Sequence, residues 1–176
     1  GKTTASKILS ERRAPLFSAD KVVKTLYKNK SFKKLIIKKF NIKGNTALKN
    51  SLRKKILENN INIKKLEKIV HPLVRKEMKK FSIINKNKKI IFFEIPLLIE
   101  SKLMKFFDVI IFIKAKKTVR LKRFMTKGGQ KKLFNTLNKK QMSDNQKSKL
   151  CDHIVVNDKN INILKKNLLA IINQYV

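Results

Sequence analysis

Apolar residues in this chain occur in short continuous runs and in stripes with helical spacing. The runs cover 15–19, 89–95, 107–113 and 153–156, and they are rich in β-branched and aromatic residues. A continuous apolar run of this length is typical of a strand that is buried on both faces of a parallel sheet. The pattern therefore predicts a parallel sheet built from these four segments.

Between the runs, apolar residues recur every three or four positions, as they do on the buried face of a helix. Leu66, Ile69 and Leu73 form such a stripe within 63–81. The helices predicted in this way cover 2–12, 20–29, 31–40, 47–58, 63–81, 96–105, 116–126, 144–150 and 160–175. Strands that alternate with helices indicate an α/β fold, and the helical block at 25–82 predicts a helical subdomain inserted into it.

The predicted core consists of 1–24 and 83–176, and it includes one segment, 127–143, that differs from its surroundings. This segment is polar and basic, and Gly128-Gly129 stands near its start. Because few apolar residues are present to anchor it, we expect a mobile lid in place of a core element.

The chain has a large excess of basic over acidic residues. Lys and Arg total 45 residues against 11 Asp and Glu, which gives a formal net charge of +34 over 176 residues. Only six of the basic residues are Arg, and the chain has two Tyr and no Trp. Proteins that read nucleic acid rely on Arg for base contacts and on aromatic rings for stacking. We therefore attribute the charge to lysine-rich solvated faces and expect only non-specific, salt-sensitive binding to nucleic acid.

Composition narrows the class of protein further. The hydrophobic fraction is 42%, enough for a folded domain with a substantial core. The longest nearly apolar run, 90–99, contains Glu94 and Pro96 and is shorter than the roughly 20 residues that cross a bilayer. A single cysteine, Cys151, excludes an internal disulfide and fits a reducing cytosol. We expect a cytoplasmic protein without a membrane partner, and the sequence leaves its oligomeric state open.

The first four residues, Gly1-Lys2-Thr3-Thr4, read as the last third of a phosphate-binding loop, G-x-x-x-x-G-K-[ST]. In such a loop, backbone N–H groups and a helix N-terminus hold phosphate, the lysine reaches the β- and γ-phosphates, and the next hydroxyl binds Mg²⁺. Lys2 and Thr3 would take these two roles. A bare Gly-Lys-Thr also occurs at ordinary helix starts, and the rest of the loop and its strand are expected ahead of Gly1.

Phosphoryl transfer also needs a group that receives a proton and cations that balance the developing charge. Asp20 follows the first predicted strand at its carboxyl end, where open α/β sheets bind ligands, and it can act as a base or cap the helix 20–29. Arg120 and Arg123 lie three positions apart on one helix face. Both can bind one anion, although the same spacing suits a solvated surface.

Several short motifs, spread along the whole chain, follow one another in the order in which they occur in a known family of proteins. They are Gly1-Lys2-Thr3-Thr4, Ser18-Ala19-Asp20, His71-Pro72-Leu73, Ile95-Pro96-Leu97-Leu98-Ile99-Glu100, Leu121-Lys122-Arg123, Gln141-Met142 and Asp152-His153-Ile154-Val155-Val156-Asn157. With them the chain resembles the dephospho-coenzyme A kinases, P-loop kinases that phosphorylate the ribose 3′-hydroxyl of dephospho-CoA. The resemblance implies a P-loop kinase fold whose first strand is missing ahead of Gly1, with ATP and Mg²⁺ as cofactors and dephospho-CoA as the small-molecule partner.

The resemblance also implies roles for individual residues. The catalytic residues would be Asp20, Lys2 and Arg123, with Asp20 as the base. The ATP-binding residues would be Gly1, Lys2, Thr3, Thr4, Arg120 and Arg123, with Thr3 at the metal. The acceptor-binding residues would be Asp20, Lys49, His71, Pro96 and Leu97. Packing alone could also account for His71 and for the segment that begins at Pro96.

The chain departs from the family pattern at four places. Ser18 stands where the family has a first Asp, Lys49 and Lys127 stand where it has Arg, and Leu137 occupies a place where an Arg often precedes the Gln. A change from Arg to Lys keeps the charge but loses the bidentate fork. We therefore expect Arg123 to carry the main fixed charge, with the lysines of the lid as diffuse support.

Three other interpretations stay open at this level. Another P-loop kinase, of nucleoside, nucleotide or shikimate type, would share the phosphate loop, but the His71-Pro72 and Pro96-Leu97-Leu98 motifs argue against it. A basic nucleic-acid-binding module would require arginines and aromatic rings clustered on one face. A third possibility is an inactive fragment that lacks half of the phosphate cradle.

Overall fold

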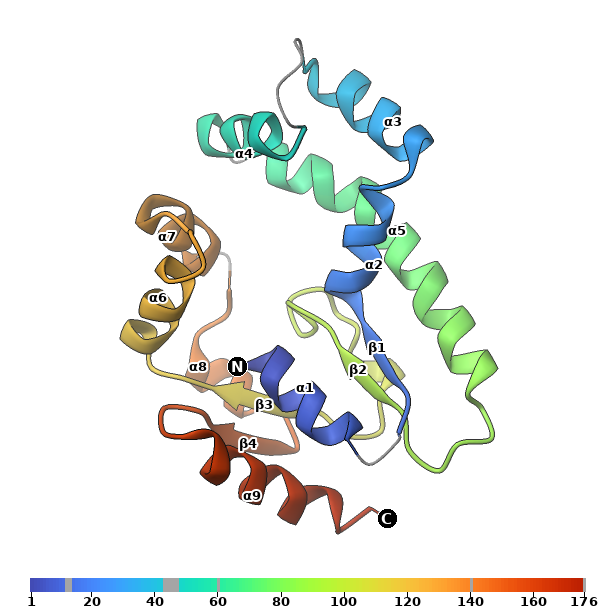
Figure 1. Ribbon diagram of the computed structural model, residues 1–176, viewed down its shortest axis with the longest axis vertical. Coiled ribbons are helices and arrows are strands. Elements are labelled where there is room, and N and C mark those ends of the chain that lie inside the picture. Colours follow the sequence, from blue (N-terminus) through green and yellow to red (C-terminus); the bar gives the residue numbers. More distant parts are fainter. Residues whose placement is uncertain (12–13, 43–47, 60, 140, 176) are drawn as a thin grey trace. The chain divides into compact units, whose positions relative to one another are not determined.

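The chain folds into two compact units in the computed structural model (Figure 1). The core unit consists of Gly1–Leu16 with Asn87–Val176, and the helical unit consists of Phe17–Lys86. The predicted inserted subdomain, 25–82, lies within the helical unit. The residues that the structure describes are 1–11, 14–42, 48–59, 61–139 and 141–175.

The strands of the structure form two pairs. β1 (Leu16–Ser18) pairs with β2 (Phe92–Glu94), and β3 (Ile111–Lys114) pairs with β4 (His153–Val156). β3 and β4 are parallel, and their register runs from Ile111 opposite His153 to Lys114 opposite Val156. The predicted α/β class with parallel strands is therefore confirmed. The strands fall within or next to the predicted runs: β4 matches its run, β1, β2 and β3 are shorter than theirs, and β3 begins four residues after the start of its run.

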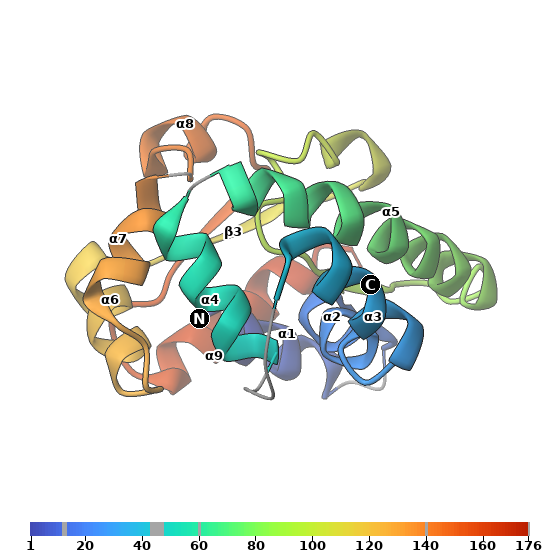
Figure 2. The same ribbon diagram turned by 90° about the horizontal axis from the view of Figure 1, so that it is seen from above.

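The remaining elements of the core unit are helices. They are α1 (Lys2–Ser10), the 3₁₀ helix η1 (Met104–Phe106), α6 (Lys117–Met125), α7 (Lys131–Lys139), α8 (Asp144–Ser148) and α9 (Ile161–Ile172). α1 and α9 lie side by side, and α6 and α7 also lie side by side in both views (Figures 1 and 2).

The hydrophobic core of this unit forms where α1 and α9 pack against the strands. α9 contributes Leu164, Leu168 and Ile172, which are spaced by four residues and so lie on one face. Leu164 and Leu168 are 1% and 0% exposed, and full burial of such a side chain stabilises the fold by about 1.5–3 kcal/mol. Partners from other elements are Ala5, Ile8, Leu9 and Val155. This packing fixes the direction of α1, whose first residues carry the phosphate-loop motif.

The helical unit has its own core. Its helices are α2 (Ala19–Leu26), α3 (Lys30–Phe40), α4 (Leu48–Glu58) and α5 (Ile61–Ile84). The buried side chains are Phe32, Ile36 and Phe40 of α3, Leu52 of α4 and Val70 of α5. α3 begins where the Asn29 side chain accepts a hydrogen bond from the Phe32 N–H at 3.0 Å, and it ends at Asn41 in a left-handed conformation. This is the ordinary use of Asn at helix ends.

One predicted helix is absent from the core unit. Residues 96–102 form turns, in which Leu97 and Lys102 have φ of 55° and 56°, and only the short η1 follows. A right-handed helix cannot contain residues with positive φ, so the prediction of a helix over 96–105 was wrong. Within the described residues, no helix is both long enough and apolar enough to span a membrane.

Candidate functional site

The N-terminus of α1 is built around a glycine that cannot be replaced without a clash. Gly1 is the N-cap, and its carbonyl accepts the Ala5 N–H at 2.9 Å. A Cβ atom at Gly1 would collide with the Asn157 side chain and lie 3.2 Å from Cγ2 of Ile113. Lys2, Thr3 and Thr4 follow in the first turn and are exposed. The orphan N–H groups of a helix start and its positive dipole favour an anion at this point.

A buried carboxylate meets this first turn. The Thr3 hydroxyl donates to Oε1 of Glu94 at 2.5 Å, and the Ser6 hydroxyl lies 3.3 Å from Oε2 of the same group. Glu94 stands at the end of β2 and is 6% exposed. Thr3 was predicted from the sequence, whereas Glu94 was not. Its position inside a continuous apolar run could have indicated a functional carboxylate, because a buried charge is costly unless it has partners.

Cations also converge on the start of α1. The charges of Lys2, Arg123 and Lys127 all act on the position of Gly1, and the charge of Glu94 acts on it with the opposite sign. The three cations favour an anion there. This agrees with the helix N-terminus, which carries partial positive charge of its own.

Arg120 and Arg123 of α6 are held by different partners. Arg123 donates from Nη1 to the Asn157 carbonyl at 3.0 Å, just beyond β4. Arg120 donates from Nε to the Ala115 carbonyl at 3.1 Å and from Nη1 to Oδ1 of Asn138 in α7 at 2.9 Å. Arg123 is thus fixed at the strand ends near Gly1, whereas Arg120 ties α7 to the end of β3.

The predicted lid is more ordered than its composition indicated. It contains α7, whose Phe134 is buried and packs against Phe124 of α6 at 5.8 Å between ring centroids. Gly129 also packs here, because a Cβ atom at that position would collide with the Phe124 ring. The apolar anchor of α7 is thus the aromatic pair Phe124–Phe134, which fastens it to α6. That the segment 127–143 closes as a lid stays a prediction. Lys127, Lys131, Lys132 and Lys139 are exposed, as expected.

The candidate acceptor residues of the helical unit lie on its helices. Asp20 is exposed in the first turn of α2, and the N-cap of that helix is Ser18. Asp20 is therefore not the helix cap, which was the alternative to a role as base. Lys49 is exposed on α4, with its Nζ atom 5.7 Å from the Tyr27 ring centroid. His71 is half-buried inside α5, which continues through Pro72.

Comparison with known proteins places this geometry in a family. A family model described as "CoaE: Dephospho-CoA kinase" matches residues 1–162. The chain belongs to the dephospho-CoA kinase family. The curated dephospho-CoA kinase of Bartonella quintana is 32% identical to it, over 98% of this chain and 91% of that protein. The dephospho-CoA kinase of Fusobacterium nucleatum is 33% identical, over 96% of this chain and 89% of that protein.

Solved structures agree with this assignment. The dephospho-CoA kinase from Campylobacter jejuni matches with a TM-score of 0.66 and 26% identity, over 98% of this chain and 90% of that chain. The protein TT1252 from Thermus thermophilus matches with a TM-score of 0.76 over 100% and 92% of the two chains. Its 22% identity supports the fold alone. The P-loop kinase fold expected from the sequence is thus confirmed.

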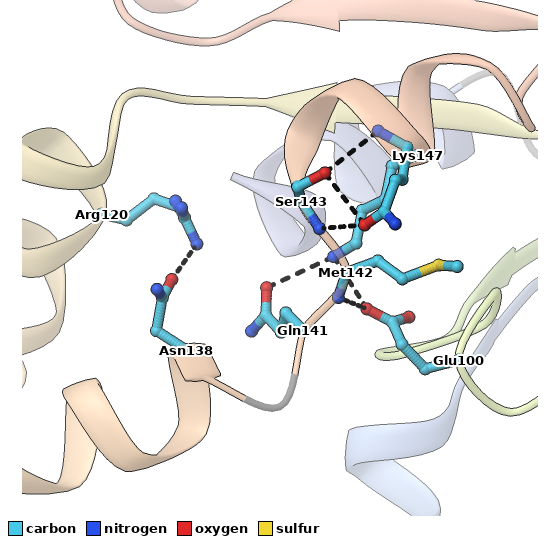
Figure 3. A network of polar contacts seen from close by, with 8 residues as sticks. Glu100, Arg120, Asn138, Gln141, Met142, Ser143 and Lys147 are labelled. Carbon is cyan, nitrogen blue, oxygen red and sulfur yellow. Dashed lines mark hydrogen bonds and ion pairs between the residues drawn. The ribbon is translucent and has the colours of Figure 1, made fainter.

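In this dephospho-CoA kinase family member, the Pro96-Leu97 motif lies in the turn that follows β2. Glu100 of the same turn forms an ion pair with Lys147 of α8 at 3.0 Å, and its Oε1 also accepts the Met142 N–H at 3.0 Å (Figure 3). Two motifs that the sequence analysis recognised separately, 95–100 and Gln141-Met142, are therefore in contact. The sequence could not show this contact, because the residues involved are more than 40 positions apart.

The structure thus brings together Gly1, Lys2, Thr3 and Arg123 in the core unit and adds Glu94 and Asn157 to them. Asp20, Lys49 and His71 belong to the helical unit, and their roles, like those of Pro96 and Leu97, stay predictions. Within the described ranges, no group of three or more His, Cys, Asp or Glu side chains could hold a metal ion.

Proposed function

We propose that this protein transfers the γ-phosphoryl group of ATP to the ribose 3′-hydroxyl of dephospho-CoA, the last step of coenzyme A synthesis. The observation that carries the proposal is the contact between Thr3 and the buried Glu94 at the start of α1, in a chain that belongs to the dephospho-CoA kinase family. A helix N-terminus with a hydroxyl and a carboxylate in contact suits a nucleotide phosphate with a divalent ion.

Residues of the core unit would bind the donor. The phosphate chain of ATP would be held at the first turn of α1 by N–H groups of the backbone and by Lys2. Arg123, fixed by the Asn157 carbonyl at 3.0 Å, supplies a positive charge that need not reorganise during the reaction. Fixed charges of this kind stabilise the charge that develops on the transferring group.

The side chains at the start of α1 also fit Mg²⁺. This ion prefers oxygen ligands and binds through one or two carboxylates together with substrate phosphates and water. The Thr3 hydroxyl and the Glu94 carboxylate provide two such oxygens, and Ser6 holds the second carboxylate oxygen in place. When bound, Mg²⁺ neutralises phosphate charge. This pairing explains why a carboxylate is buried at the end of β2.

The acceptor would be bound and activated by the residues that the family resemblance assigns to it. Asp20 accepts the proton of the ribose 3′-hydroxyl, and its exposure in the first turn of α2 leaves the carboxylate accessible. Lys49, His71, Pro96 and Leu97 would contact the acceptor. The use of ATP and the single cysteine support a cytoplasmic location, and we propose no specific nucleic-acid partner.

The test is an ADP-release assay on the full-length protein with ATP and Mg²⁺. Dephospho-CoA, adenosine and shikimate are offered in parallel, and a matched series contains EDTA. We expect turnover with dephospho-CoA alone and its loss when Mg²⁺ is chelated. Turnover only with adenosine or shikimate would assign another kinase class, and turnover that survives chelation would refute the assignment of Thr3 and Glu94 to a metal.

A further inference from the structure

Glu100 and Lys147 form a buried ion pair outside the phosphate site. Their charged atoms are 3.0 Å apart, and the side chains are 16% and 11% exposed. The Lys147 Nζ atom also lies 5.9 Å from the centroid of the Phe112 ring in β3. The pairs Lys55–Glu58, Lys80–Glu77 and Lys165–Glu11 have side chains at least 41% exposed. The Glu100–Lys147 pair is more deeply buried than these three.

The pair contacts both residues of the Gln141-Met142 motif. Oε1 of Glu100 accepts the Met142 N–H at 3.0 Å, and Lys147 Nζ donates to Oε1 of Gln141 at 3.4 Å (Figure 3). Lys147 itself is well placed, because α8 begins with a capping box in which the Ser143 and Gln146 side chains satisfy each other's backbone N–H groups. The chain that leaves α7 is thus fastened to the turn that follows β2.

On the side of the turn, the pair adjoins a segment with an unusual backbone. Leu97 and Lys102, on either side of Glu100 in the sequence, both have positive φ, which is uncommon for residues other than glycine and asparagine. Such conformations persist where surrounding contacts fix them, and they concentrate at functional sites. Glu100 is held as a carboxylate: burial raises its pKa, but hydrogen bonds from its own N–H, from Lys147 and from Met142 outweigh burial and lower it.

On the other side, α7 is fastened to α6. The Phe124–Phe134 contact and the hydrogen bond from Arg120 to Asn138 connect the two helices. We therefore expect a displacement of α6 and α7 to move Met142. Because the Met142 N–H donates to Glu100, this movement would also shift Glu100. A buried ion pair adds little net stability compared with apolar side chains of the same size, but its geometry is specific. We therefore attribute to this pair the positioning of the segments that it connects, and not a gain in stability.

We propose that Glu100 and Lys147 are a positioning pair that couples the turn 96–102 to the segment after α7, so that binding of ATP and binding of the acceptor strengthen each other. This inference rests on the proposed function, because it takes the turn to be the acceptor side and α6–α7 to be the ATP side. Coupling between two sites is reciprocal, so either ligand can be used to measure it.

The experiment measures the Kd of dephospho-CoA by calorimetry, with and without a saturating non-hydrolysable ATP analogue and Mg²⁺. In the unmodified full-length protein we expect the analogue to tighten acceptor binding at least fivefold, the lower end of typical coupling. In Lys147→Met the ratio should fall below twofold. Lys147→Arg keeps the charge and should retain most of the coupling.

A matched control uses the pair formed by Glu11 and Lys165 in the same unit. Its atoms are 3.1 Å apart, but its side chains are 58% and 51% exposed. Lys165→Met should leave the coupling ratio unchanged. If Lys147→Met does not fold because Glu100 is left buried and unpaired, the double variant Glu100→Gln/Lys147→Met removes both charges, and it should fold with its coupling lost.

Two results would overturn the inference. One is an unmodified protein that phosphorylates dephospho-CoA without any effect of the analogue on acceptor binding. The other is full coupling in a folded Lys147→Met or double variant. Neither result affects the kinase assignment, which fails only if the unmodified protein does not transfer phosphate to dephospho-CoA.

Discussion

The two units hold their candidate residues in different ways. In the core unit, Thr3 and Arg123 are fixed by partners far away in the sequence: Thr3 by Glu94 and Arg123 by the Asn157 carbonyl, at sequence separations of 91 and 34. In the helical unit, Asp20 and Lys49 are exposed on helix surfaces. The candidate phosphate-binding residues are thus held in place, whereas the candidate acceptor-binding residues Asp20 and Lys49 are accessible. We therefore expect variants of the two units to lose different properties. Core-unit variants should lose interactions with ATP, and helical-unit variants should lose only the use of the acceptor.

The largest effect is expected at Asp20. Asp20→Asn preserves the size of the side chain but removes the proton acceptor, so turnover should fall by about 10²–10⁴, the usual contribution of general acid–base catalysis. ATP binding, measured by calorimetry, should stay within about twofold, because Asp20 belongs to the helical unit. The control is Glu58→Gln, another exposed carboxylate of that unit, which should retain full activity. Near-normal turnover of Asp20→Asn would make Asp20 a structural residue.

The second effect tests the core unit at Glu94. Glu94→Gln keeps an acceptor for the Thr3 hydroxyl but removes the buried negative charge. The Mg²⁺ concentration that gives half-maximal activity should rise by about 10–100-fold, the usual cost of losing a group that supports a metal site. A titration of activity against Mg²⁺ at constant ATP measures it. If the curve does not move, Glu94 is present only to hold Thr3 and Ser6.

The third effect compares two cations near Gly1. Arg123 is anchored to the Asn157 carbonyl, whereas Lys127 is exposed just after α6. A fixed charge stabilises a transition state better than a mobile one, so Arg123→Ala should cost more in kcat/KM than Lys127→Ala by more than about tenfold, or ~1.4 kcal/mol. Thermal unfolding of both variants separates lost catalysis from lost structure. Equal losses in kcat/KM would move the key cation to the lid.

The same contrast explains what could be predicted from the sequence. Helices and buried strands follow from local periodicity, so α3, α4 and β4 lie close to their predicted bounds. The helix predicted over 96–105 satisfied local rules, with a proline at its start and leucines after it. The turn that replaces it contains residues with positive φ, and its Glu100 pairs with Lys147, a contact between distant residues that local periodicity cannot reveal. The role of Glu94 was not predicted for the same reason, because it depends on the Thr3 hydroxyl, 91 positions away in the sequence.

The smallest effect concerns the residues that adopt a left-handed backbone conformation, with positive φ, in each unit. The helical unit places Asn41, which tolerates this conformation, at the end of α3, whereas the core unit places Lys102 in the turn after β2. Lys102→Asn should therefore relieve about 1 kcal/mol and raise the thermal midpoint by about 2–4 °C, and Asn41→Lys should lower it by a similar amount.

Leu97 makes this last comparison informative about function. It has the same backbone conformation as Lys102, but it belongs to the motif that we assign to the acceptor. Leu97→Asn should relieve similar strain while raising the KM for dephospho-CoA, and Lys102→Asn should leave that KM unchanged. Scanning calorimetry and steady-state kinetics on the three variants give both quantities. If Leu97→Asn is neutral in KM, the strain at this turn serves packing, and the acceptor must be bound by other residues of the core unit.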